Sequence, residues 1–287
     1  MKTNLIKAVL VTGTSSGIGK SIALHLDKME YKVYAGVRNK SDGEELKKLS
    51  SKNLQPVIID VTDENTINST KEFIETEIIN YSSFTLVNNA GVALGSPLEI
   101  QPHSQLRFEM EVNYFGVISV IQKFLPVLRE KKGKIINISS ISGKSSMPFN
   151  GTYCASKFAL EAATDALRLE LKPWGIYVSN ILPGDIKTEI WEKAITDIDT
   201  RAAEWKPEAI KLYGPTIEFM KDTIRNVKGS NPNVISKAVE KLLKSNNPKT
   251  RVYIGENVWL YYFLEKLPTA LRDWLILSRL PKYGNIK

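Results

Sequence analysis

The chain has 287 residues, of which 43% are hydrophobic, 24% charged and 9% aromatic, a composition that argues against a disordered, collagen-like or disulfide-stapled protein. Its length fits one large domain or two modest ones. The formal net charge of +8 is compatible with nucleic acid, anionic membranes or phosphorylated cofactors. Because the basic residues are scattered and do not alternate with aromatic residues, we expect a lysine-rich solvated surface and no nucleic-acid partner.

Cysteine and histidine content limits the redox and metal chemistry. The single cysteine, Cys154, has no partner in the chain for a disulfide, and with only His25 and His103 there is no zinc-binding pattern. The segment up to Lys7 is polar and is followed by an apolar run too short for a secretion signal. We therefore expect no metal and a reducing, cytoplasmic compartment.

Strand-like and helix-like segments alternate along the chain. Short apolar or β-branched runs bounded by turn residues predict strands at Ala8–Val11, Lys32–Val37, Val57–Val61, Leu86–Asn88, Ile135–Ile138, Tyr177–Leu182 and Arg251–Ile254. Apolar residues at three- and four-residue spacing predict helices at Ile18–Met29, Glu64–Ile79, Gln105–Arg129, Tyr153–Leu171 and Val234–Lys244. This βαβ alternation predicts an α/β fold with a Rossmann-like, doubly wound parallel sheet, whose ligands bind at the carboxyl ends of the strands.

We expect one domain over residues 1–287, with a core at about 5–191 and 234–255. The pattern loosens at about 185–233, which we interpret as a substrate loop that closes over the site. The C-terminal helical extension, about 256–287, is apolar and aromatic but too interrupted by charges to span a bilayer. Its amphipathic helices can cap the site, pack on a partner or lie on a membrane surface, and plain core packing is the alternative.

A glycine-rich loop follows the first predicted strand. Gly13, Gly17 and Gly19 let the backbone turn sharply and approach a pyrophosphate, whose charge suits the N-terminus of the next helix. Ser15 and Ser16 add hydroxyl donors. A tight strand-to-helix turn without a ligand is the alternative, but the position after the first strand favours dinucleotide binding.

The second strand ends at Val37 and is followed by Arg38, with no acidic residue at that place. An Asp or Glu there would accept hydrogen bonds from an adenosine ribose and repel a phosphate, whereas an arginine pairs with a 2′-phosphate. The sequence therefore favours NADP(H) over NAD(H), unless Arg38 is simply a solvated surface residue.

Four polar residues stand at a specific spacing. Tyr153 and Lys157 are four residues apart, which places them on one face of a helix, one turn from each other. Ser140 follows the fifth predicted strand and Asn113 lies in the preceding predicted helix. The pair alone means little, but the set of four is specific.

With these residues the sequence resembles the short-chain dehydrogenase/reductase family. The segment Thr12–Gly19 is similar to the family's cofactor loop, Asn88–Gly91 to its sheet-stabilising motif, Tyr153–Lys157 to its active-site motif and Pro183–Thr188 to its nicotinamide-side loop. The likeness covers about Leu5 to Trp191, and it implies a catalytic tetrad of Asn113, Ser140, Tyr153 and Lys157.

The resemblance assigns a role to each member of the tetrad. Tyr153 would pass its proton to the carbonyl oxygen as hydride arrives, or remove it in reverse, and Lys157 would lower the tyrosine pKa from about 10 towards neutrality. Ser140 would hydrogen-bond the substrate oxygen. Asn113 would hold a water that links Lys157 to solvent.

The resemblance also implies the residues that bind the cofactor. They are Gly13, Ser15, Ser16, Gly17, Ile18 and Gly19 at the pyrophosphate, Arg38 at the 2′-phosphate, Asp60 and Val61 by the adenine, Asn89, Ala90 and Gly91 by the ribose, Pro183, Gly184, Ile186 and Thr188 at the nicotinamide, and Tyr153 and Lys157. Asp185 departs from the apolar or aromatic residues common at its place, which puts the geometry of that loop in question.

Within the family the sequence is most similar to the hydroxysteroid and retinol dehydrogenase branch, through Lys32–Arg38 and Tyr153–Glu161. This implies a lipophilic carbonyl or alcohol substrate. The residues expected to line its site are Trp191, Trp205, Tyr213, Phe219 and Met220, unless they are ordinary core residues. We expect reduction of the carbonyl if the cofactor is NADPH.

Two alternatives to a steroid- or retinoid-type enzyme remain open. One is a 3-ketoacyl reductase that acts on acyl thioesters, and the other is a non-catalytic protein that senses NADP(H). An enzyme peripheral to an anionic membrane is compatible with the basic charge and the aromatic tail. Relatives in the family commonly pair through the helix equivalent to Tyr153–Leu171, so we expect a homodimer or homotetramer.

Overall fold

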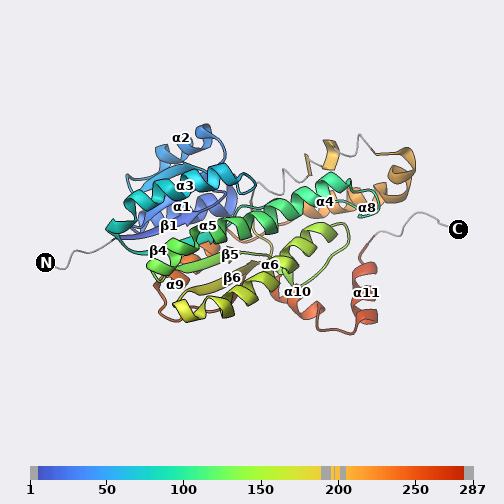
Figure 1. The fold of residues 1–287 in the computed structure, drawn as a ribbon. Helices are drawn as coiled ribbons and strands as arrows, with labels where there is room; N and C mark the ends of the chain where they lie inside the picture. The colour runs from blue at the N-terminus through green and yellow to red at the C-terminus, as the bar shows by residue number, and fades with distance from the viewer. Residues whose placement is uncertain (1–5, 189–194, 197, 201–204, 281–287) are drawn as a thin grey trace.

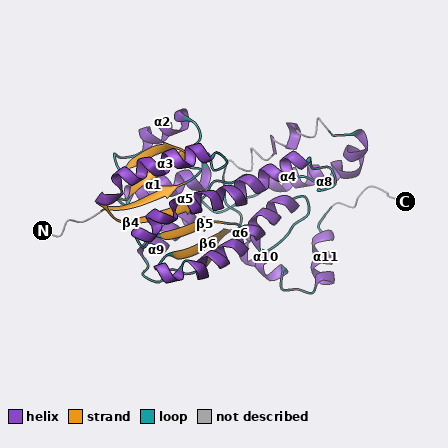
Figure 2. Ribbon diagram, in the orientation of Figure 1, coloured by secondary structure: helices purple, strands orange, loops and turns teal. Residues whose placement is uncertain are grey.

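The computed structural model describes residues 6–188, 195–196, 198–200 and 205–280. Within this part of the chain, one sheet of seven parallel strands forms the centre of the molecule (Figures 1 and 2). The strands are β1 Ile6–Val11, β2 Lys32–Val37, β3 Leu54–Ile58, β4 Tyr81–Asn88, β5 Lys134–Ile138, β6 Tyr177–Pro183 and β7 Arg251–Ile254. The predicted α/β fold with a doubly wound parallel sheet is therefore confirmed.

Helices connect the strands and cover the sheet. Those described are α1 Gly17–Lys28, α2 Lys40–Leu49, α3 Glu64–Glu77, α4 His103–Met110, α5 Gly116–Glu130, α6 Gly151–Glu170, α8 Pro207–Arg225, α9 Asn233–Lys244, α10 Val258–Leu264 and α11 Thr269–Leu277. Short helical turns are η1 Ile78–Asn80, η2 Glu111–Phe115, η3 Ile141–Gly143 and η4 Lys172–Trp174.

The strand order is β3-β2-β1-β4-β5-β6-β7. The chain therefore winds in one direction from β1 to β3 and in the other from β4 to β7, and the order reverses between β1 and β4. In such sheets the loops that leave the carboxyl ends on either side of this reversal form the ligand-binding crevice. The register pairs Val11 with Ala35 of β2 and with Val87 of β4, so the carboxyl ends of the three strands lie within two residues of one another.

Two hydrophobic cores lie on the two faces of the sheet because side chains alternate along each strand. Leu10 of β1 faces the core that includes Phe124 of α5. Val9 and Val11 face the other core, which includes Ile22 of α1. Helices α3, α5 and α6 contribute to the first core, and α1, α2 and α9 contribute to the second. This burial on both faces fixes the sheet as a rigid platform for the loops at its edge.

Several elements differ from the prediction. Strand β3 is Leu54–Ile58 and not Val57–Val61, because Pro56 lies within a strand that pairs on one side only, where a missing N–H is tolerated. Helix α2 was not predicted, since its sequence is mostly polar and buries only Gly43 and Leu46. The predicted helix Gln105–Arg129 is divided by η2, a π-helical turn.

Elements α4, α8, α10 and α11 gather at the end of the molecule away from the N-terminus (Figure 1). Helix α8 forms much of the predicted substrate loop, and α10 and α11 form the predicted C-terminal extension. Among the described helices, none combines the length and apolarity needed to cross a bilayer.

Candidate active site

The loop between β1 and α1 turns on glycines in the left-handed region. Gly13 has φ +66° and Gly17 has φ +56°, values that strain any residue with a Cβ. A Cβ on Gly13 would lie 2.8 Å from Cα of Ala90, and one on Gly19 would lie 2.1 Å from the carbonyl oxygen of Gly13. The loop therefore depends on glycine both for its turn and for close packing against the loop after β4.

Asn89 joins the carboxyl ends of β1 and β4. Its Nδ2 donates to the carbonyl oxygens of Thr12, at 3.0 Å, and Gly13, at 2.9 Å. The hydroxyl oxygen of Thr12 in turn accepts from the backbone N–H groups of Asn89 and Ala90, both at 3.0 Å. These hydrogen bonds hold the glycine loop in place at the reversal of strand order.

The N-terminus of α1 faces this crevice, and no side chain caps it or balances the positive end of its helix dipole. Ser16 occupies the N-cap position but its side chain makes no capping hydrogen bond, and the first turn has no acidic residue. Ser15 is exposed, and Ser16 and Ile18 are partly exposed. Unpaired N–H groups and the helix dipole favour an anion at such a terminus.

The carboxyl ends of β2 and β3 carry the next predicted residues. Arg38 is exposed directly after β2, and its guanidinium has no hydrogen-bond or ion-pair partner among the described residues. The Asp60 carboxylate accepts from the backbone N–H of Thr62 at 2.9 Å and from its hydroxyl at 2.8 Å, which closes the turn after β3. Val61 is buried beside Gly116. Asp60 and Val61 thus shape this loop, while Arg38 keeps its charge available.

Ser140, Tyr153 and Lys157 come together beyond β5. Ser140 lies at the start of η3, where its Oγ accepts from the N–H of Ser142 at 3.1 Å, and its hydroxyl is near enough to that of Tyr153 to lower the tyrosine pKa. On α6, the ammonium of Lys157 lies 5.7 Å from the ring centre of Tyr153 and donates to the carbonyl oxygen of Ile138 at 3.2 Å. A helix turn and the end of one strand therefore present a hydroxyl, a phenol and an ammonium to the same place.

Asn113 reaches the same place from η2. Its Nδ2 donates to the carbonyl oxygen of Val92 at 2.8 Å and to Oγ of Ser156 at 3.0 Å, while its Oδ1 accepts from the N–H of Val92 at 2.9 Å. A Cβ on Gly91 would lie 3.1 Å from Oδ1 of Asn113 and 3.6 Å from Nζ of Lys157. The structure thus brings all four predicted tetrad residues together with Gly91.

Burial dominates the ionisation of the tyrosine and the lysine. It raises the pKa of Tyr153 to about 12, although the hydrogen bond with Ser140 acts in the opposite direction and Glu109 adds to the rise. Burial lowers the pKa of Lys157 to about 8, against the carboxylates of Glu161 and Glu109, which raise it. Burial therefore raises the tyrosine pKa in the protein alone, whereas the sequence predicted that Lys157 would lower it.

The loop after β6 is held by the chain that follows β7. A Cβ on Gly184, the residue after Pro183, would lie 2.1 Å from the carbonyl oxygen of Glu256, so only glycine fits. The carboxylate of Asp185 accepts from Nδ2 of Asn257 at 2.7 Å. Burial raises the pKa of Asp185, and this hydrogen bond opposes the rise. The unusual residue at this position therefore ties the loop to the start of α10.

Farther along the same loop, Ile186 is buried and forms a β-bridge with Ser230. Thr188 approaches the glycine loop, because a Cβ on Gly17 would lie 3.4 Å from its side chain. The loops after β1 and β6 are thus in contact across the crevice.

One of the predicted substrate-lining residues is placed against the active-site loops. Tyr213 of α8 packs against Phe149 with ring centres 6.1 Å apart, and its hydroxyl donates to the carboxylate of Glu99. The others predicted are Trp191, Trp205, Phe219 and Met220. Trp191 lies outside the described residues, Phe219 is exposed, and Trp205 and Met220 are partly buried.

The fold and these loops are those of a known family. The sequence profile of the short chain dehydrogenase family matches residues 7–199, which is more than half of the 287 residues. The chain belongs to this family. It is an oxidoreductase of the dehydrogenase/reductase class, a class that uses a nicotinamide cofactor.

Similar proteins confirm the predicted branch of the family. Estradiol 17-beta-dehydrogenase 2 of Mus musculus is 34% identical over 94% of this chain and 74% of that protein. Retinol dehydrogenase 7 of Rattus norvegicus is 31% identical over 98% of this chain and 89% of that protein. A 3-amino-tetrahydro-pyrrolizinone reductase of Xenorhabdus hominickii is 35% identical over 95% of this chain and 96% of that protein.

Solved structures agree with the fold. A short chain dehydrogenase from Burkholderia cenocepacia in complex with NADP superposes with a TM-score of 0.72 at 25% identity, over 96% of this chain and 99% of that one. A short-chain dehydrogenase from Streptomyces avermitilis gives a TM-score of 0.75 at 25% identity, over 96% and 98%.

Two buried carboxylates of this short chain dehydrogenase were missed by sequence reasoning. Glu109 of α4 and Glu161 of α6 are 0% and 2% exposed. Glu161 accepts from Asn180 at 2.5 Å and from Arg251 at 2.9 Å, and it pairs with Lys144 at 3.2 Å. Each glutamate lies four residues, or one helical turn, from a tetrad residue, and that spacing was the available signal.

A third missed feature connects the site to the C-terminal extension. The hydroxyl of Ser145, which follows η3, donates to the carboxylate of Glu265 at 3.0 Å, and Arg272 of α11 pairs with the same carboxylate at 2.8 Å. The extension of this short chain dehydrogenase is therefore anchored to the loop that carries Ser140.

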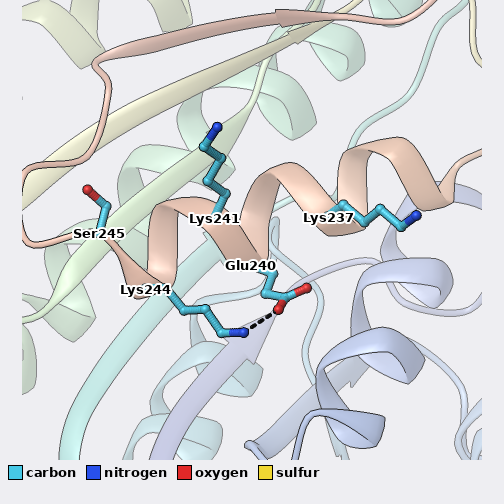
Figure 3. Close-up of a pocket in the computed structure, with 5 residues that line it drawn as sticks. All are labelled: Lys237, Glu240, Lys241, Lys244 and Ser245. Carbon is cyan, nitrogen blue, oxygen red and sulfur yellow. Dashed lines mark hydrogen bonds and ion pairs between the residues drawn. The ribbon is translucent and has the colours of Figure 1, made fainter.

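A surface hollow on α9 has no part in this site. It has a volume of about 590 Å³ and is lined by Lys237, Glu240, Lys241, Lys244 and Ser245 (Figure 3). Glu240 pairs with Lys244 within it. Because α9 ends at Lys244 and leads to the amino end of β7, the hollow lies away from the carboxyl edge of the sheet.

Proposed function

We propose that this protein is an NADP(H)-dependent oxidoreductase that interconverts a carbonyl and an alcohol on a lipophilic substrate, with Tyr153 as the general acid and base. The observation that carries the proposal is the grouping of Tyr153 with Ser140 and Lys157 at the carboxyl end of β5. This grouping faces Gly91, next to the glycine loop. A proton donor and a dinucleotide-binding loop therefore share one crevice.

The loops fit a dinucleotide. Positive φ at Gly13 and Gly17 brings backbone within reach of a pyrophosphate, and the uncapped N-terminus of α1 favours its charge. The residues that would hold the pyrophosphate are those of the glycine loop, Gly13, Ser15, Ser16, Gly17, Ile18 and Gly19. Asp60 and Val61 would border the adenine, Asn89, Ala90 and Gly91 the ribose, and Pro183, Gly184, Ile186 and Thr188 the nicotinamide.

Arg38 supports NADP(H) over NAD(H). Its exposed guanidinium stands at the end of β2 with no partner among the described residues, which leaves it available for a 2′-phosphate. Similar structures with NADP bound agree with this choice.

Tyr153 suits proton donation at neutral pH. A phenol with a pKa of about 12 stays protonated there, so it can donate to the carbonyl oxygen during reduction. When bound, the nicotinamide supplies or accepts the hydride and, in its oxidised form, carries a positive charge. Ser140 hydrogen-bonds the same oxygen and keeps it beside the phenol. The ammonium of Lys157 stabilises the phenolate that remains after the proton has left.

Asn113 acts by bracing the site. Its side-chain amide is committed to Val92 and Ser156, so it fixes the loop after β4 against α6. The family resemblance also implies that Asn113 holds a water that links Lys157 to solvent. Asn113 therefore supports the proton path without donating a proton itself.

The substrate is of the class that the relatives' names indicate. Estradiol, retinol and a pyrrolizinone appear in the names of the similar proteins, and each has a carbonyl or hydroxyl group on an apolar or cyclic frame. Tyr213 of α8 packs against Phe149, which lies just before α6, and the two rings would form an aromatic wall for such a substrate. Residues 185–233, the predicted substrate loop, would close over such a molecule.

Assembly follows from exposed apolar side chains. Phe158 and Leu169 on the outer face of α6 are 43% and 62% exposed, which suits pairing with a second copy as a homodimer or homotetramer.

Trp259, Phe263 and Trp274 of the extension are each more than half exposed, which suits peripheral contact with a membrane surface. Sedimentation with anionic liposomes tests the second contact, because Trp274→Glu should partition less than the unmodified protein.

A cofactor titration followed by a substrate panel tests the proposal. NADPH and NADH are titrated by cofactor fluorescence, and ketones, aldehydes and acyl thioesters of graded lipophilicity are then added while NADPH absorbance is followed. Tight NADPH binding with turnover of lipophilic ketones or aldehydes supports the proposal. Turnover of acyl thioesters alone favours a ketoacyl reductase, and NADPH binding without turnover of any member favours a sensor or a substrate outside the panel.

A further inference from the structure

Glu109 is a buried carboxylate next to the tetrad. It lies on α4, is 0% exposed, and stands one helical turn before Asn113. Its Oε1 accepts from the backbone N–H of Leu94 at 2.7 Å. The carboxylate therefore holds the same loop that Asn113 holds at Val92, two residues earlier.

The loop at Leu94 is also tied to the start of α6. The carbonyl oxygen of Leu94 accepts from Nε2 of Gln101 at 3.1 Å, and Oε1 of Gln101 accepts from the hydroxyl of Thr152 at 2.9 Å. Thr152 directly precedes Tyr153. A continuous set of hydrogen bonds therefore runs from Glu109 through the loop after β4 to the turn of α6 that carries the tyrosine.

The charge of Glu109 acts on three groups of α6. It raises the pKa of Tyr153, of Lys157 and of Cys154, although burial is the largest cause of the shift in each of the three. Glu161 also raises the pKa of Lys157, but it is already paired with Arg251. Of the two buried carboxylates, Glu109 is the one that acts on both the phenol and the ammonium.

We propose, resting on the proposed function, that Glu109 is a positioning residue for the Tyr153–Lys157 pair: its carboxylate fixes the loop at Leu94 and, through Gln101 and Thr152, the turn of α6 that carries the tyrosine. The negative charge of Glu109 also favours the protonated phenol, which holds the proton that passes to the carbonyl oxygen as hydride reaches the carbonyl carbon. With Glu109 present, carbonyl reduction thus continues to higher pH, and alcohol oxidation begins only under more alkaline conditions.

The variant Glu109→Gln separates the two parts of this role. Glutamine keeps an oxygen to accept the N–H of Leu94 but removes the charge. We expect the high-pH midpoint of kcat for reduction to move down by about one pH unit, the shift that removing a unit charge about 12 Å away produces at an effective dielectric constant of about 20. NADPH affinity should stay within about twofold. Glu111→Gln, two residues along and exposed, makes the same change of charge and should leave the midpoint unchanged.

Two further variants keep the test decisive. Glu109→Asp retains the charge but withdraws it from Leu94, so kcat should fall about tenfold while the pH midpoint stays. An unchanged kcat, or a midpoint that moves down, contradicts the proposal. This test remains available even if Glu109→Gln does not fold. A Glu109→Gln enzyme with the unmodified midpoint overturns the electrostatic role. If the unmodified protein turns over no substrate, or Tyr153→Phe remains active, the proposed function fails, and with it the basis of this proposal.

Discussion

Gly13 allows a stringent test of how the cofactor loop is built. Its φ of +66° strains a residue with a Cβ, and that Cβ would lie 2.8 Å from Cα of Ala90. Gly175 has φ +70°, but no atom lies within 4 Å of the Cβ position. Alanine at Gly175 therefore introduces backbone strain alone, while alanine at Gly13 adds a steric clash with the loop after β4.

The two substitutions differ in expected size. Left-handed backbone costs alanine about 1–2 kcal/mol, and reduced freedom of the unfolded chain offsets up to about 1 kcal/mol, so Gly175→Ala should destabilise by about 0–2 kcal/mol. The clash adds about 1–3 kcal/mol, as overpacking does elsewhere, so Gly13→Ala should be about 1–3 kcal/mol less stable than Gly175→Ala.

Urea unfolding at one protein concentration gives the two free energies, and fluorescence titration gives NADPH affinity. Gly13→Ala should weaken NADPH binding at least about tenfold, the equivalent of about 1.4 kcal/mol, while Gly175→Ala leaves it unchanged. Equal destabilisation by the two variants would refute the steric argument. Unmodified NADPH affinity in Gly13→Ala would refute the assignment of this loop to the cofactor.

Three more substitutions probe other parts of the account. Arg38→Asp should weaken NADPH at least about tenfold and spare NADH in the same titration, since a carboxylate repels the 2′-phosphate; equal losses for both cofactors would contradict it. Lys157 has a pKa of about 8 folded against 10.5 unfolded, so the folded state binds fewer protons between these values and unmodified stability rises with pH across them. Lys157→Met should thus be about 3 kcal/mol more stable at pH 7 by urea unfolding, with the difference lost by pH 10.5; a constant difference would contradict this. Glu265→Ala should free the extension from Ser145 and speed proteolytic cleavage near α11, and unaltered cleavage would argue against the anchor.

The sequence predicted the architecture because strand and helix patterns repeat at regular intervals. Helix Tyr153–Leu171 was found within two residues, at Gly151–Glu170, since its apolar face is long and periodic. Helix α2 was missed because a polar surface helix leaves little hydrophobic signal. Strand β4 begins at Tyr81 and not at Leu86. Ser82 and Ser83 interrupt the apolar run that the prediction relied on, and the strand extends through them because Tyr81 and Ser83 pair with Ile6 and Lys7 of β1, with a register shift at Ser82.

Site residues could be predicted where the reaction requires a particular residue type at a fixed spacing. They could not be predicted where a residue's effect depends on its burial in the folded protein. The tetrad and the glycine loop are recognisable from spacing, and the structure brings them together. The raised pKa of Tyr153 was not foreseen, because desolvation depends on tertiary burial that no spacing shows. Glu109 was missed for the same reason, since burial distinguishes it from the exposed Glu111 nearby.

The central claim is that Tyr153 donates the proton during NADPH-dependent reduction. A single-turnover experiment compares the unmodified protein with Tyr153→Phe, which keeps the ring but lacks the hydroxyl, at saturating NADPH and with the substrate found in the panel. The account predicts the same NADPH dissociation constant for both proteins and a rate of NADPH oxidation at least about a hundredfold lower in the variant. A Tyr153→Phe variant that oxidises NADPH at the unmodified rate would contradict it.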